Sequence, residues 1–262
     1  MRRLLNPIAL TACVWLGAAA YTAAQTDFDW TGQLAPGQRV EIIGLNGSIR
    51  ATAARGDNIV VTAVKRAGRR GNPADVRIET VAHAGGVTIC AIYAAPGGAP
   101  ANECRAGGRG RNDVRDNDTA VDFTVQVPAA IGLAARTVNG SIDAQGLQGD
   151  AEGTTVNGSV TMSTTGSARA TTVNGSINAS MGRAVWPDGG KFTTVNGEVT
   201  LRLPATVNAD VRLSTVSGGL RSDFPLSISN EPGPKHAEGV LGGGGQKLDV
   251  TTVNGGITLL RN

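Results

Sequence analysis

The chain has 262 residues, of which 37 are glycine, only 3% are aromatic and 17% are charged. So few aromatic side chains are poorly suited to a large globular core, and they favour a narrow β core of Val, Ile, Ala and Leu. The formal net charge is +3, and without Arg2 and Arg3 the remaining Lys and Arg nearly balance the 21 Asp and Glu residues. The charge therefore gives no reason to expect a nucleic-acid partner.

Residues 1–24 are typical of an export signal, which makes residues 25–262 the mature chain. Arg2 and Arg3 precede an apolar segment, and small residues precede a cleavage site after Ala24. Cleavage after Ala20 is one alternative, and lipidation of Cys13 within the string LTAC is another. No later stretch approaches the roughly 18 apolar residues of a membrane-spanning helix. We expect an exported protein that is periplasmic, bound to the outer surface or secreted.

Residues 25–135 are predicted to form an N-terminal β region with several strands of alternating or β-branched character. Cys90 and Cys104 are joined here by a short segment containing glycine and proline. In an oxidising compartment such a pair predicts a disulfide, worth about 3 kcal/mol by loop-entropy estimates. A metal site is the alternative, although only His83 lies nearby in the sequence as a further ligand.

The segment after Tyr93 is a surface loop by composition, and it carries two groups of charged residues. Its arginines are candidates for binding an anionic glycan or envelope lipid, with a solvated loop of internal Arg–Asp pairs as the alternative: Arg105, Arg109, Arg111 and Arg115. Its carboxylates are weak calcium candidates without EF-hand spacing, and Asx turns are the simpler interpretation: Asp113, Asp116 and Asp118. We predict no cofactor and no metal.

One motif returns roughly every 20 residues from residue 136 to the end, which predicts a solenoid of stacked units that share one core. The motif is TVNGSI at 137–142, TTVNGSV at 154–160 and TTVNGGI at 251–257, with LNGSI at 45–49 as a distant first copy. The central Asn-Gly pairs are predicted to be structural: Asn46, Gly47, Asn139, Gly140, Asn157, Gly158, Asn174, Gly175, Asn196, Gly197, Asn254 and Gly255.

Asn-Gly between strand formers is typical either of a β-hairpin or of a corner in a β-helix coil. A hairpin would give two mixed faces, whereas a continuous coil predicts Val156 and Val160 inside and Thr155, Asn157 and Ser159 outside. We favour the coil, with Asn in the left-handed region and Gly leaving room at the corner. Stacked coils then place ladders of Thr, Asn and Ser on the outside, about 4.8 Å apart.

The TVNGSI words, the segment SDFPL at 222–226, the glycine run at 242–245 and the closing LDVTTVNGGITLL resemble the bacterial DUF4097 family. Members of that family are described as putative adhesins. The resemblance implies a secreted or envelope-associated β-solenoid, and it carries no catalytic residue that could be transferred to this chain.

The sequence thus predicts an all-β fold, a single-stranded β-helix whose N-terminal β region caps or extends the repeats of residues 136–262. We expect an exported, non-enzymatic binding or structural module of the envelope or cell surface, with a polysaccharide or the envelope surface as partner. The alternatives are a carbohydrate-active β-helix enzyme and a periplasmic signalling or stress component. Because the last copy of the motif ends near Asn262, an unprotected solenoid end would also permit end-to-end self-association.

Overall fold

The computed structural model describes residues 27–108, 110–229 and 233–262. The predicted export signal, with Cys13, lies outside the described residues, and so does Arg109. Within the described residues no helix has the length and apolar character that crossing a membrane requires.

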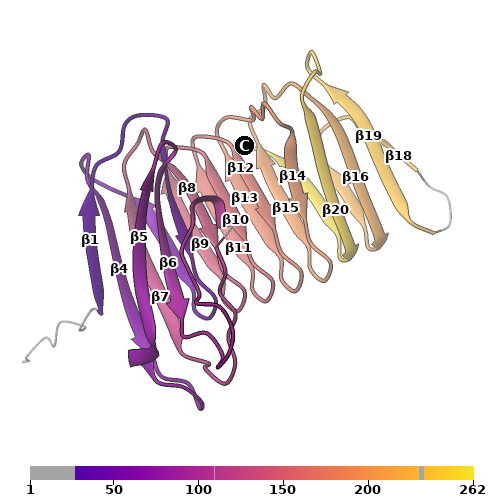
Figure 1. Cartoon of the computed structure of the whole chain (residues 1–262). Coiled ribbons are helices and arrows are strands. Elements are labelled where there is room, and N and C mark those ends of the chain that lie inside the picture. Colours follow the sequence, from indigo (N-terminus) through magenta and orange to yellow (C-terminus); the bar gives the residue numbers. More distant parts are fainter. Residues whose placement is uncertain (1–26, 109, 230–232) are drawn as a thin grey trace, which may run out of the picture.

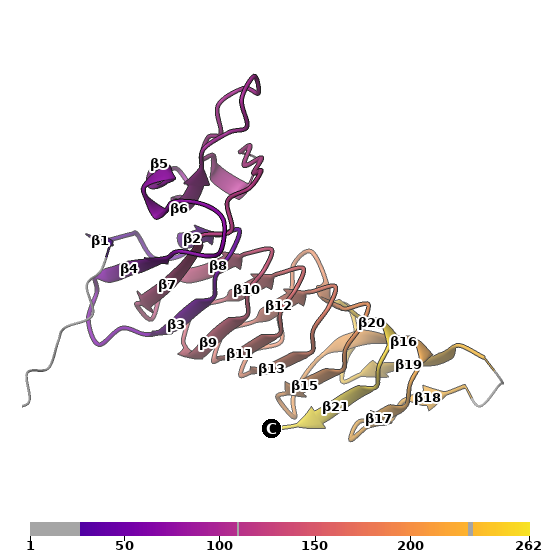
Figure 2. The ribbon, with the colours of Figure 1, turned by 90° about the horizontal axis from the view of Figure 1, so that it is seen from below.

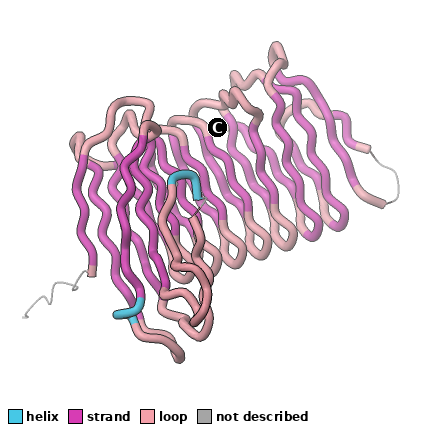
Figure 3. The backbone as a smooth tube through the Cα atoms, in the orientation of Figure 1, coloured by secondary structure: helices cyan, strands magenta, loops and turns pink. Residues whose placement is uncertain are grey.

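Nearly all regular structure is β, arranged in two sheets that face each other across one core (Figures 1 and 3). Sheet A contains, in spatial order, β1 (Phe28–Gly32), β4 (Ile59–Arg66), β7 (Ala120–Val127), β3 (Ile49–Ala53), β9 (Ile142–Leu147), β11 (Val160–Thr164), β13 (Ile177–Met181), β15 (Val199–Leu203), β21 (Ile257–Arg261) and β17 (Leu220–Ser222). Sheet B contains β18 (Ser227–Ile228), β19 (Lys235–Leu241), β16 (Ala209–Ser217), β20 (Lys247–Asn254), β14 (Gly190–Thr193), β12 (Ala168–Thr171), β10 (Ala151–Thr154), β8 (Gly132–Arg136), β2 (Arg39–Ile43), β6 (Gly86–Tyr93) and β5 (Val76–His83). Two short 3₁₀ helices, η1 (Pro73–Asp75) and η2 (Ala106–Gly108), complete the described elements.

Each coil that carries the motif runs along a strand of sheet B, turns at the Asn-Gly corner, or at Ser217-Gly218 in one coil, and returns along a strand of sheet A (Figure 2). Strands of successive coils pair in parallel: Val160 on β11 lies beside Ile142 on β9 and Ile177 on β13. On the other sheet, β10 pairs in parallel with both β8 and β12. The chain therefore continues through Asn-Gly instead of folding back, which confirms the predicted β-solenoid.

The order of coils in space differs from their order in the sequence. The coil of β2 and β3 lies between β6 and β7 on one side and β8 and β9 on the other. At the far end, the last coil of the chain, β20 and β21, is inserted between β14 and β15 and the coil of β16 and β17. The motif that closes the sequence is thus an inner coil, so the premise of an open end at Asn262 is wrong.

Antiparallel strands cover both ends of the solenoid. At the N-terminal end β4 pairs antiparallel with β7 and with β1, and β5 pairs antiparallel with β6. At the other end β19 pairs antiparallel with β16 and with β18. Only a three-residue strand, β17, and a two-residue strand, β18, form the outermost edges there, and short edge strands are a common protection against edge-to-edge pairing.

The side-chain assignment at the corner differs from the sequence prediction. Val160 and the residues equivalent to it in other coils are buried, as expected, but Thr155 is only 1% exposed and Val156 is 37% exposed. The same threonine position is buried in the other coils: Thr137, Thr172, Thr194, Thr215 and Thr252. The amides of Val156 and Asn157 both donate to the carbonyl of Val138 on the neighbouring coil. Strand alternation is therefore interrupted at the corner, and two consecutive side chains face outward.

This assignment predicts that Val156→Asp leaves the fold nearly intact. The new carboxylate would lie at the surface, where substitutions usually change the free energy of unfolding by less than about 0.5 kcal/mol. Thermal unfolding of the variant and the parent chain checks the prediction, with Val156→Thr as a control that keeps the β-branched shape. If the variant lost as much stability as a protein loses when a charge is buried, Val156 would have to face the interior.

The glycines of the corners are required by close stacking of the coils. A Cβ added to Gly158 would lie 2.2 Å from the carbonyl oxygen of Gly140, and one added to Gly140 would lie 1.9 Å from that of Gly47. The asparagines do not adopt the predicted left-handed conformation, because Asp116 is the only non-glycine residue with positive φ in the described part of the chain.

Candidate functional site

The six corner asparagines form one continuous ladder along the solenoid. In each step the side-chain Nδ2 donates to the Oδ1 of the preceding asparagine at 2.8 Å, so that the ladder runs through Asn254, Asn196, Asn174, Asn157, Asn139 and Asn46. All donors point the same way, and hydrogen bonds in such a chain polarise one another. The amides are thereby held in one orientation at the surface.

A second ladder lies directly inside the first. The hydroxyl of each buried threonine donates to a glycine carbonyl of the adjacent coil, as Thr155 Oγ1 does to Gly140 O at 2.8 Å. Equivalent bonds are made by Thr137, Thr172, Thr194, Thr215 and Thr252. A buried hydroxyl without a partner would destabilise the fold, so these bonds explain why threonine is tolerated inside.

The outer side of sheet A continues the polar surface beyond the asparagines. Thr161, Asn178, Thr200 and Thr258 lie side by side on β11, β13, β15 and β21 in one register row. We call these four residues, together with Asn139, Asn157, Asn174, Asn196 and Asn254, the hydroxyl-amide face. Strand spacing sets its repeat at about 4.8 Å. The predicted outward ladders of Asn and Thr are present, with Thr161 and its equivalents in place of the corner threonines.

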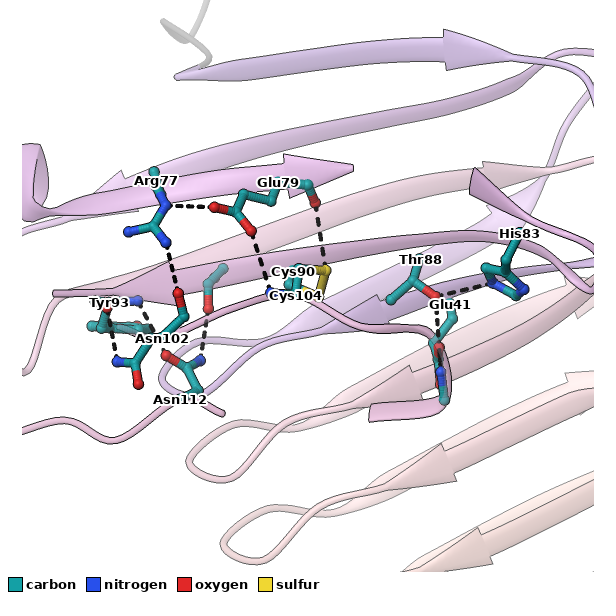
Figure 4. The surroundings of a disulfide bond; sticks show 12 residues. Glu41, Arg77, Glu79, His83, Thr88, Cys90, Tyr93, Asn102, Cys104 and Asn112 are labelled. Carbon is teal, nitrogen blue, oxygen red and sulfur yellow. Dashed lines mark hydrogen bonds and ion pairs between the residues drawn. A yellow bond between two sulfur atoms is a disulfide. The ribbon is translucent and has the colours of Figure 1, made fainter. Parts of the chain in front are cut away.

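The loop between β6 and β7 is fixed to the outer side of sheet B by covalent and polar contacts (Figure 4). Cys90 and Cys104 form the expected disulfide, with their Cα atoms 5.7 Å apart. Asn102 Nδ2 donates to the carbonyls of Tyr93 and Asp113, and Tyr93 N donates to Asn112 Oδ1 at 3.1 Å. The Tyr93 hydroxyl donates to Thr119 O at 2.6 Å, and burial raises the pKa of this tyrosine.

The arginines predicted as an anion-binding group are dispersed over the loop. Arg105 pairs with Glu103 at 2.9 Å and Arg111 with Asp113 at 3.6 Å, whereas Arg115 is exposed and forms no ion pair within the described residues. Arg105 and Arg111 thus have carboxylate partners within the loop, and anion binding by this group stays a prediction.

The three carboxylates named as calcium candidates have separate partners. Asp113 faces Arg111, Asp116 lies 3.9 Å from Arg70 Nη1, and Asp118 accepts hydrogen bonds from the backbone amides of Arg70 and Arg69. The amide of Arg70 is the main cause that lowers the pKa of Asp118 below its ordinary value. Among residues 27–108, 110–229 and 233–262, no group of three His, Cys, Asp or Glu side chains converges as a metal site would require.

The ladder asparagines from Asn139 to Asn254 lie within a segment that matches a known protein family. The sequence model of the family described as Toastrack DUF4097 matches residues 117–260, more than half of the chain. The chain belongs to the DUF4097 family. No curated protein matches it.

Three solved structures resemble this DUF4097 chain at low similarity. A putative cell adhesion protein from Clostridium sporogenes shares 9% identity with a TM-score of 0.42, covering 90% of this chain and 99% of its own. A putative adhesin from Bacteroides fragilis shares 9% identity with a TM-score of 0.35, covering 90% and 96%. A putative adhesin from Parabacteroides merdae shares 9% identity with a TM-score of 0.21, covering 89% and 95%.

The disulfide-closed loop precedes the segment that the DUF4097 model matches, and it covers a buried ionic group that the sequence analysis missed. Glu41 is 1% exposed on the outer side of β2. Its Oε2 accepts hydrogen bonds from Thr88 Oγ1 at 2.8 Å and from Gly107 N at 2.7 Å, and its Oε1 lies 3.6 Å from Arg136 Nε. His83 Nε2 lies 3.1 Å from the same threonine hydroxyl. The alternation of RVEII places Glu41 outward, and no local signal in the sequence shows that a distant loop covers it.

Proposed function

We propose that this protein is an exported, non-enzymatic β-solenoid that binds polysaccharide at the cell envelope or cell surface through the hydroxyl-amide face. The observation that carries the proposal is the asparagine ladder, in which every amide is fixed by its neighbour at 2.8 Å. Hydroxyl and amide groups are the donors and acceptors that sugar hydroxyls pair with.

The rigidity of the face supports binding over a large area. The side chains of Asn174 and Asn196 are already fixed by the ladder, so a ligand would order few of these amides when it binds. Binding surfaces that are already ordered lose less conformational entropy on association. A repeat of about 4.8 Å along the solenoid suits a ligand that is itself a repeating polymer.

Two further observations support an exported binding module. The Cys90–Cys104 disulfide suits an oxidising compartment outside the cytoplasm. The repeated outward residues are Thr and Asn, which are not the groups that usually serve as general acids or bases at neutral pH. We therefore favour binding of polysaccharide over its hydrolysis. The experiment below also distinguishes the signalling and structural alternatives.

The experiment measures binding of residues 25–262 to an array of bacterial and host polysaccharides, with release of products followed in the same wells. The variant Asn178→Glu/Thr200→Glu adds two larger, negatively charged side chains to the face. They should block the contacts with sugar hydroxyls and weaken binding about ten-fold or more. The matched control is Thr171→Glu/Thr193→Glu, which places the same charges on the sheet B strands of the same two coils.

Saturable binding that the face variant loses and the control retains supports the proposal. Equal binding by both variants removes the hydroxyl-amide face as the site. Release of products contradicts the non-enzymatic assignment, and absence of binding to every polysaccharide favours a structural or signalling role.

A further inference from the structure

A groove with a volume of about 420 Å³ lies on the outer side of sheet B, where the coils enter β2, β8, β10 and β12. Pockets for small ligands usually enclose about 300–1,000 Å³. The groove is lined at one end by Arg39 and at the other by Arg169, with Gln148, Asp150 and Val185 between or beside them. It lies on the opposite sheet from the hydroxyl-amide face and stands independently of it.

A glycine on β8 leaves room for the hollow. Gly132 is aligned with Arg39 on β2, and on its other side the next strand begins after Asp150. Ala134, the next outward residue of β8, separates Glu41 from Glu152. Gly132 lines the groove and has no side chain to fill the space beside Arg39, whereas Ala134 and Glu41 are buried further along their strands and lie outside the groove.

Two arginines that line the groove, Arg39 and Arg169, form no ion pair with a described residue. Arg183 pairs with Asp150 at 2.8 Å, and Arg136 pairs with Glu152 at 3.1 Å. Arg39, in contrast, is exposed between Gly86 and Gly132 and forms no ion pair with a described residue. The groove therefore offers two arginines that form no ion pair with its carboxylates, although Glu152 is the cross-strand neighbour of Arg169.

Arg169 is the second such group. Its Nε donates to Gly189 O at 2.9 Å, which fixes the guanidinium, while its Nη2 is buried without a hydrogen-bond partner in the part of the chain that the structure describes. An unpaired buried donor on a charged group is costly, so a carboxylate that displaces the atoms now covering Nη2 would relieve that cost. Guanidinium groups bind carboxylates with geometry that favours two parallel hydrogen bonds.

Apolar surface lies beside these polar groups. Val185, which is 47% exposed, and Pro187 line the same groove near the arginine end formed by Arg169. A sugar ring has C–H groups that can contact such a surface while its hydroxyls and carboxylate meet polar groups. A second groove around Arg212 differs, because Arg212 is already paired with Glu238 at 3.0 Å.

We propose that this groove binds an acidic oligosaccharide, with one carboxylate at Arg39, another at Arg169 and a ring against Val185. Arg39 and Arg169 stand three strands apart, which places their backbones about 14 Å apart along the solenoid axis. The bond from Arg169 Nε to Gly189 O directs its guanidinium toward β14, away from β2, so the two arginines do not converge on one carboxylate. The ligand therefore carries at least two acidic sugar units.

The test uses tetragalacturonic acid as the probe and its full methyl ester as an uncharged ligand of nearly the same shape, with binding to residues 25–262 measured by calorimetry. We expect saturable binding of the acid, about ten-fold or more weaker binding of the ester, and similar weakening by Arg39→Gln. The matched control Arg55→Gln, on the exposed turn after β3, should bind like the parent chain. Arg169→Gln should also weaken binding, and its unfolding temperature is measured because it loses the bond to Gly189.

Three results would overturn the inference: no binding of the acid, equal binding of acid and ester, or unchanged binding in Arg39→Gln. The face variant Asn178→Glu/Thr200→Glu separates this groove from the proposed function. Loss of tetragalacturonate binding in that variant, with retention in Arg39→Gln, would assign the acid to the hydroxyl-amide face. Loss in Arg39→Gln alone supports the groove whether or not the face binds neutral polysaccharide.

Discussion

Replacing Gly158 by alanine should destabilise the solenoid by about 3 kcal/mol, at the upper end of the usual cost of overpacking. The added Cβ would lie 2.2 Å from Gly140 O and 2.5 Å from Gly140 C, and both atoms belong to backbone that cannot rotate away. The same carbonyl accepts the hydroxyl of Thr155 at 2.8 Å. The substitution therefore separates two coils at their closest point and weakens a buried hydrogen bond as well.

Gly219→Ala is the matched control, because a Cβ at Gly219 has no atom within 4 Å and its φ lies outside the region that favours glycine. Reduced entropy of the unfolded chain should leave this variant unchanged or up to about 1 kcal/mol more stable. Urea unfolding of both variants and the parent chain gives the comparison. If Gly158→Ala were as stable as Gly219→Ala, the glycines of the corners would not be required by coil stacking.

The repeat unit and the path of the chain through each repeat could be predicted because both depend on local sequence. Asn157-Gly158 recurs with strand formers on both sides, and alternation read straight through the corner favoured a coil over a hairpin. The inward side of β11, β13, β15 and β21 was correct for the same reason. Each of these elements follows the two-residue period of a strand, which local pattern reports well.

The corner could not be predicted in this way, because its side-chain directions depend on a neighbouring coil. Thr155 and Val156 have nearly the same shape, and the threonine is inside only because Gly140 O accepts its hydroxyl. No pattern within one repeat shows that acceptor. The insertion of β20 and β21 between earlier coils is likewise decided by pairing between distant segments, as is the burial of Glu41 beneath Gly107.

Anion binding by the charged loop was inferred from composition and stays a prediction. Arg105 and Arg111 were grouped as anion ligands because they are close in the sequence, yet each is paired with a carboxylate two residues away. The sequence does not indicate that Arg39 and Arg169 belong together, because they are far apart in the chain and lie on different strands. Three parallel pairings, from β2 through β8 and β10 to β12, bring them to one groove.

Replacing both Cys90 and Cys104 by serine should release the loop over Glu41 while the solenoid remains folded. Closing a loop of about 15 residues by a disulfide is worth about 3 kcal/mol by the chain-entropy estimate. The loop has little core of its own, because the disulfide packs with Ile92, Ile43 and Val81 in a small cluster apart from the main core. The cost of losing the crosslink should therefore appear as local opening.

Amide hydrogen exchange distinguishes local from global opening. Gly107 N, which donates to Glu41 Oε2 at 2.7 Å, and Tyr93 N, which donates to Asn112 Oδ1, should exchange much faster in Cys90→Ser/Cys104→Ser. Val160 N, which bonds to Ser176 O between inner coils, is the internal control and should keep its protection. Equal acceleration at all three amides would show that the disulfide stabilises the whole solenoid. Unchanged exchange at Gly107 would show that Asn102, Asn112 and Glu41 hold the loop without it.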